Sequence, residues 1–313
     1  MSTPHDPSED RSSERPQSPS HPSYPAYPST PHPEDNPGYA GHQQYGQYSD
    51  YNAYDTGGAA PATGTGKVHV MQAVSWAFKA IFRSWPLWIL GALAFFVLTF
   101  LLSFIFNIGN ATAADPTAVN VGDIVVAVVS VVVSVLIYNA ALRQVDNRTV
   151  GWGDLTRNVN FWPTLGTLLL VQLAVVVILT VIALPFALPM ITTEMTDLAD
   201  DQVAMAFLGR VLGLVAFILF VSLFLYPLTT FIAWYVADRR AGIGEAVKLG
   251  VRAGLANYGR LLLFFFVSGI LIMIAALVTF GLAMIFVMPV YTLIQAMLYR
   301  QASAGPLPAP ADR

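Results

Sequence analysis

Apolar residues form long runs that dominate the chain from about residue 85 onward. The longest run, Leu261 to Leu298, contains no charged side chain. Because about 20 apolar residues cross the hydrocarbon core of a bilayer, this run is long enough for two crossings with a turn near Phe280 and Gly281. Four other apolar runs begin near residues 85, 124, 161 and 204. The pattern predicts an all-α polytopic membrane protein with six transmembrane helices.

Short motifs before the apolar runs predict that the six spans form three hairpins, each preceded by a surface helix. Two copies have glycine, apolar residue, glycine and acid in the same register. They predict helix starts at Gly151, Gly153 and Asp154 in one copy and at Gly242, Gly244 and Glu245 in the other. A third copy without the glycines lies at residues 74–79. We expect each copy to form an amphipathic helix in the membrane interface.

The N-terminal residues 1–66 differ from the rest of the chain in composition. They are rich in Pro, Ser, Tyr, Gly and Gln and have almost no aliphatic side chains. Such a segment cannot bury enough apolar surface to offset the entropy lost on ordering, so a disordered tail is predicted. The predicted domains are therefore this tail, a membrane domain at 67–301 and a short disordered C-terminal tail at 302–313.

Prolines and tyrosines recur at every third position within the N-terminal tail. The positions are Pro16, Pro19, Pro22, Pro25, Pro28 and Pro31, followed by Tyr45, Tyr48, Tyr51 and Tyr54. Polyproline II has three residues per turn, so these side chains would line one edge of an extended segment. One interpretation is a strip that docks a cytoplasmic protein partner, and the other is a solvated spacer.

The distribution of charge indicates both the class and the orientation of the protein. Charged residues make up 11% of the chain, against about 25% in soluble domains. Outside the tail, nearly all Lys and Arg fall on one side of a six-span arrangement. The positive-inside rule then places both termini in the cytoplasm, with the domain in the plasma membrane. The tail carries eight acids and two bases, which argues against a nucleic-acid partner.

The sequence offers no convincing catalytic or metal site. Cysteine is absent, and four of the five histidines are scattered in the tail. Asp154 and Glu245 could be a carboxylate pair for acid-base chemistry, although each also suits the first turn of a helix, where an acid complements the helix dipole. Uncharged polar residues within the spans, Asn139, Gln172, Ser222 and Gln295, could line a path or form bonds between helices. We expect neither an enzyme nor a cofactor.

The last unit of the chain resembles a known family. Its features are Gly242-Ile243-Gly244-Glu245-Ala246-Val247-Lys248, then Asn257-Tyr258-Gly259, an apolar hairpin, and Leu298-Tyr299-Arg300. This pattern is similar to the six-span membrane domain fused to some glycerophosphoryl diester phosphodiesterases, and to uncharacterised membrane proteins of bacteria, including actinobacteria. The resemblance implies a membrane domain without the catalytic one. We therefore expect a non-enzymatic envelope protein, either a membrane-homeostasis or a partner-docking platform, with a transporter of lipid or small molecules as the alternative.

Overall fold

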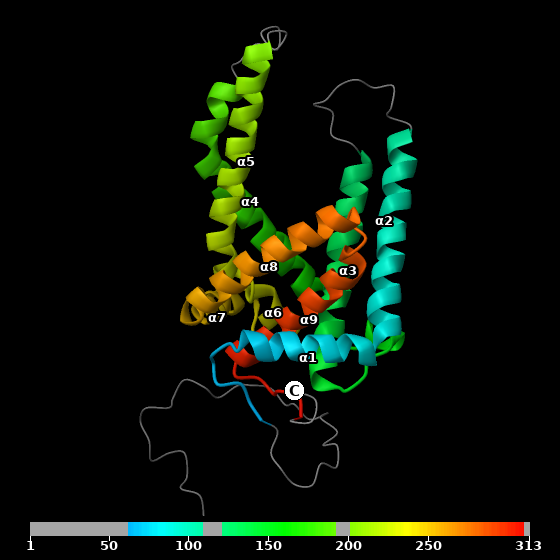
Figure 1. Cartoon of the computed structure of the whole chain (residues 1–313). Coiled ribbons are helices and arrows are strands. Elements are labelled where there is room, and N and C mark those ends of the chain that lie inside the picture. The colour runs from blue at the N-terminus through cyan, green and yellow to red at the C-terminus, as the bar shows by residue number, and fades with distance from the viewer. Residues whose placement is uncertain (1–61, 109–120, 192–200, 310–313) are drawn as a thin grey trace, which may run out of the picture. The chain divides into compact units, whose positions relative to one another are not determined.

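The computed structural model describes residues 62–108, 121–191 and 201–309, all within one compact unit, Asn52–Arg313. These residues form helices joined by turns and one isolated antiparallel bridge, so the predicted all-α class is confirmed for them (Figure 1). The elements are α1 (Val70–Arg83), the π-helical turn η2 (Pro86–Leu90), α2 (Gly91–Ile108), α3 (Val121–Asp146), the 3-10 turn η3 (Trp152–Asp154), α4 (Phe161–Ile191), α5 (Asp201–Thr229), α6 (Ile232–Ala237), α7 (Ile243–Ala256), α8 (Tyr258–Thr279) and α9 (Met284–Ala302).

Five helical segments among the described residues are long and apolar enough to cross a membrane. They are Pro86–Phe106, Val121–Asp146, Phe161–Leu188, Met205–Ala237 and Tyr258–Thr279. Large apolar side chains project from them unburied, such as Leu173 at 64% exposure and Leu277 at 70%. Apolar surface on this scale requires lipid around it, which makes the chain a multi-pass membrane protein.

The predicted count of six spans is not confirmed, because α9 is not among the five segments. Its second half contains Gln295, Arg300 and Gln301, and this half is buried within the protein. The chain does turn between α8 and α9 at Phe280 and Gly281, both of which have positive φ. Glycine adopts that backbone conformation at little cost, and the Gly281 N–H closes the end of α8 on the Ala276 carbonyl oxygen at 2.8 Å.

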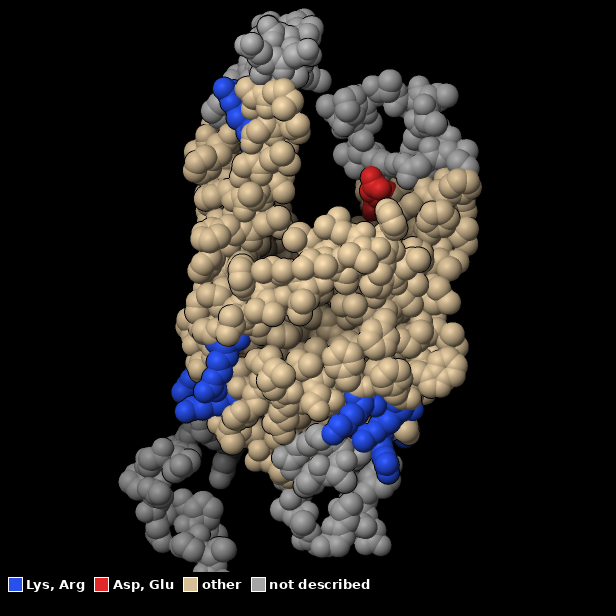
Figure 2. Space-filling model, viewed as in Figure 1, with Lys and Arg blue, Asp and Glu red and all other residues tan. Residues whose placement is uncertain are grey.

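The core lies at one end of the helical body, where α1 runs across the ends of the spanning helices and packs against α9 (Figure 1). Trp76, Trp234 and Tyr299 are fully buried there. Most of the Lys and Arg visible in Figure 2 gather at this end, which we call the basic end. Figure 2 shows few charged side chains at the other end. Asp123 lies in the first turn of α3, and Arg210 lies in the first half of α5. The one-sided pattern of basic residues is therefore present in the fold.

The corner between α1 and the first span is fixed by side-chain bonds. The Ser84 hydroxyl accepts the Val150 N–H at 2.9 Å, and the Trp88 indole N–H donates to Gln144 at 3.1 Å. Both bonds join this corner to the end of α3 and the residues after it. The π-helical turn that begins with Pro86 therefore leads from the surface helix into the spanning helix at a fixed position.

Glycine allows α7 to approach the end of α5 closely. A Cβ atom at Gly254 would overlap the carbonyl oxygen of Pro227, and one at Gly250 would lie 2.9 Å from the Ile232 backbone nitrogen. Pro227 itself lies in the last turn of α5, which ends at Thr229 before the short α6 continues. The small residues of α7 are therefore required by backbone packing at the break between α5 and α6.

Candidate functional site: a buried charge cluster and a docked linker

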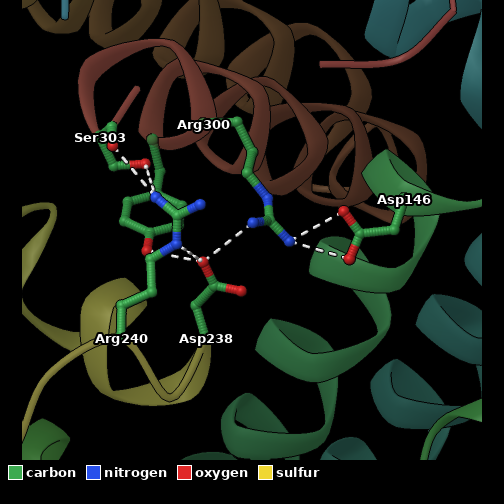
Figure 3. Close-up of polar contacts among 6 residues, drawn as sticks. Asp146, Asp238, Arg240, Arg300 and Ser303 are labelled. Carbon is green, nitrogen blue, oxygen red and sulfur yellow. Dashed lines mark hydrogen bonds and ion pairs between the residues drawn. The ribbon is translucent and has the colours of Figure 1, made fainter. Parts of the chain in front are cut away.

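A fully buried arginine lies near the end of α9 and binds two carboxylates (Figure 3). One terminal nitrogen of Arg300 donates to both carboxylate oxygens of Asp146 at 2.8 Å. Its other terminal nitrogen donates to Oδ2 of Asp238 at 3.0 Å. A buried charge is tolerated only when it is paired and hydrogen-bonded. Arg300 therefore fixes the end of α3 and the residue after α6 against α9.

Asp238 is shared by three donors. Besides Arg300, it accepts the Tyr299 hydroxyl at 2.8 Å and pairs with Nε of Arg240 at 2.9 Å. Burial and then the charge of Asp238 raise the pKa of Tyr299 well above its usual range, so the phenol remains a donor at neutral pH. Arg240 also donates to the carbonyl and hydroxyl oxygens of Ser303, at 3.0 and 3.2 Å. We call Asp146, Asp238, Arg240, Tyr299 and Arg300 the charge cluster.

The residues before α1 are docked beside this cluster. The Leu307 N–H donates to the Ala62 carbonyl oxygen at 2.8 Å, and the Gly64 N–H donates to Gly305 at the same distance. Farther along, the Gly66 N–H donates to the Gln301 carbonyl oxygen at 3.0 Å. Residues 62–66 and 302–307, predicted to belong to two disordered tails, are therefore bonded to each other. We call residues 62–68 the docked linker.

Asn257, between α7 and α8, holds the other end of the docked linker. Its side-chain oxygen accepts the Val68 N–H at 2.9 Å, and its side-chain nitrogen donates to the Gly66 carbonyl oxygen at 3.0 Å. Gly64 fits only because it has no side chain, since a Cβ there would lie 2.6 Å from the carbonyl oxygens of Arg300 and Gln301. Gly64 therefore allows the close backbone docking of the linker against the end of α9.

The two glycine motifs predicted to start surface helices differ in the structure. Gly242 is the residue before α7, with Gly244 and Glu245 in its first turn. Gly151 instead precedes a three-residue 3-10 turn that includes Gly153, and the Asp154 carboxylate accepts the Gly151 N–H at 2.9 Å. The surface helix predicted for that copy is therefore absent from the described residues.

The side chain of Asn139 explains why the motif that begins at Gly151 forms a turn and not a helix. Its side-chain nitrogen donates to the carbonyl oxygens of Asp154 at 3.0 Å, Leu155 at 3.1 Å and Arg157 at 3.3 Å. In a helix, these carbonyl oxygens would accept backbone N–H groups of the same helix. Here they accept the Asn139 side chain of α3 instead, which holds the residues after Gly151 in a turn. Asn139 therefore has a structural contact rather than a place on a polar path.

The remaining polar candidates of the spans lie in separate places. Ser222 donates to the Ile218 carbonyl oxygen of its own helix, Gln295 donates to the Tyr226 hydroxyl, and Gln172 is exposed.

The two predicted carboxylates have different surroundings. Oδ1 of Asp154 lies 3.8 Å from Nη1 of Arg143, whereas Glu245 is exposed on α7. The described residues contain no group of three or more His, Asp or Glu that could hold a metal ion. The ten prolines and tyrosines of the tail strip lie outside the described residues.

Residues 82–305 match a family described as "Protein of unknown function (DUF975)". No curated protein and no solved structure matches the chain. The match agrees with the resemblance to uncharacterised membrane proteins, whereas the link to phosphodiesterase fusions stays a prediction. The matched range includes the whole charge cluster and ends just before Leu307, the residue that bonds to the docked linker.

Proposed function

The chain belongs to the DUF975 family, whose function is unknown, and we propose that it is a non-enzymatic platform protein of the bacterial plasma membrane. In this proposal it has six spans, both termini are cytoplasmic, and the N-terminal tail docks a cytoplasmic protein. The tail would act through its prolines and tyrosines at every third position, which share one edge of an extended segment.

The observation that carries the proposal is the docked linker. Residues 62–68 are bonded to residues 301–307 and to Asn257, so the chain that follows the tail starts from a fixed place at the basic end. A spacer would need no such attachment. A docking tail gains from it, because a tethered partner is held near the membrane at a raised effective concentration.

The test compares two tails of identical composition on the full-length protein. A photo-crosslinking amino acid replaces Tyr48, and the partners captured in cells are compared for the native tail and for a tail with scrambled proline and tyrosine spacing. We expect both proteins to reach the membrane in equal amounts and only the native tail to capture its partners. Equal capture by both tails would reject docking by spacing and leave the tail as a spacer.

A further inference from the structure

A large apolar groove lies between α1, α8 and α9. Its volume is about 1070 Å³, whereas pockets for small molecules usually measure about 300–1,000 Å³. Its walls include Val74 and Phe78 of α1, Val267 and Leu271 of α8, and Val290 and Ile294 of α9. Such walls fit hydrocarbon and offer little to a polar solute.

The wall contributed by α1 belongs to a helix with three distinct sides. Ala73, Ala77 and Ala80 are buried on one side. Met71, Phe78 and Phe82 form an exposed apolar side, although helix surfaces in contact with water are usually polar. Lys79 and Arg83 lie on a third, polar side together with Gln72 and Ser75. This arrangement suits a helix at the membrane surface, whose apolar side meets acyl chains while its basic side meets headgroups.

Polar residues gather where α1 and α8 begin. His69, Gln72 and Arg260 line this end of the groove, and Arg260 donates to the Val68 carbonyl oxygen at 3.3 Å. Arg260 is exposed, and within the described parts of the chain it has no carboxylate partner. An arginine without an acid at the mouth of an apolar groove suits a phosphate group, which a guanidinium can bind through two parallel N–H donors.

We propose that this groove binds one anionic phospholipid, with the acyl chains between α1, α8 and α9 and the phosphate at Arg260. The apolar walls match the chains, and the polar mouth matches the headgroup. The groove opens at the basic end, where the charge of the protein favours anionic lipid over zwitterionic lipid. The proposal does not depend on the tail.

The test uses full-length protein in phosphatidylcholine vesicles that contain a small fraction of photoactivatable phosphatidylglycerol or photoactivatable phosphatidylcholine. Labelled residues are mapped by mass spectrometry. We expect phosphatidylglycerol to label groove residues more strongly than the face of α8 that carries Leu277. Arg260→Gln should lower the preference for phosphatidylglycerol over phosphatidylcholine about fivefold, the factor that one Arg near an anionic surface supplies. Arg252→Gln, on the exposed surface of α7, should leave it unchanged.

A second pair of variants tests the groove itself. Val267→Trp places a large ring between the walls and should abolish most labelling of the groove by both lipids, whereas Leu277→Trp on the exposed face of α8 should not. If Val267→Trp lowers stability in detergent, Ala275→Leu takes its place. Uniform labelling around the spans, or equal labelling by the two lipids in the wild type, would overturn the proposal. So would crosslinks between two protein copies across the groove in place of lipid.

Discussion

Replacing Arg300 with methionine should destabilise the protein more than replacing any exposed arginine. The change removes a guanidinium that is fully buried and that makes two bonds of 2.8 Å to Asp146 and one of 3.0 Å to Asp238. Asp238 keeps Arg240 and Tyr299, but Asp146 loses both of its bonds to Arg300 while its side chain is only 21% exposed. Removing one partner of a buried pair costs about 3–5 kcal/mol, so we expect a loss of that order.

The assay is unfolding by SDS titration in mixed micelles, with exposed Arg252→Met as the matched control. The control should change the free energy of unfolding by about 0.5 kcal/mol or less. Adding Asp146→Asn to Arg300→Met should recover part of the loss, since it removes the carboxylate that Arg300 neutralised, with a coupling of about 0.5–3 kcal/mol.

The same variant has a local readout. The Gly66 N–H donates to the carbonyl oxygen of Gln301, the neighbour of Arg300, so loss of the cluster should loosen the docked linker. Trypsin should then cleave after the exposed Lys67 faster in Arg300→Met than in Arg252→Met. A loss below about 1 kcal/mol together with unchanged cleavage would refute the view that the cluster holds this end together.

Three further outcomes are expected. Gly254→Ala should lower the free energy of unfolding by about 1–3 kcal/mol, because the added Cβ would overlap the Pro227 carbonyl oxygen. Gly244→Ala is the control: its added Cβ would meet no atom within 4 Å, so it should be nearly neutral in the same SDS titration. In whole cells, a membrane-impermeant thiol reagent should label Arg210→Cys and not Gly244→Cys; the reverse labelling would invert the proposed orientation. Asp154→Asn and Glu245→Gln should leave protein level and cellular phenotype near wild type, and loss of phenotype at normal abundance would argue for a catalytic carboxylate at that position.

The apolar runs predict the spanning helices well because a spanning helix is defined mainly by the length and composition of its own residues. The sixth predicted span, at α9, stays unconfirmed for a physical reason. Its first half is apolar enough for lipid, but its last turns carry Gln295, Arg300 and Gln301, which find partners only inside the folded protein. Similarly, Trp76 lies in the segment predicted to form an interfacial helix, yet its side chain is 1% exposed and belongs to the core.

The charge cluster could not be predicted because its partners are 62 and 154 residues apart in the sequence. Asp238 reads as the start of a basic linker, and Arg300 reads as a residue that closes the last span. One signal was available: Asp238 directly follows one apolar run, and Asp146 follows another a few residues after Arg143, where the other flanking charges are mostly basic. Two acids and one arginine at the same predicted side of the membrane form a plausible ionic group, but only the fold shows that they meet.

The position of Arg300 also sets an order for biogenesis. Asp146 and Asp238 are synthesised before Arg300, so their bonds to its guanidinium form only after α9 has been made. A chain that stops before residue 300 keeps all five candidate spanning segments, yet it lacks the cation that joins α3 to the residue after α6. The last helix therefore supplies the group that joins two segments made long before it.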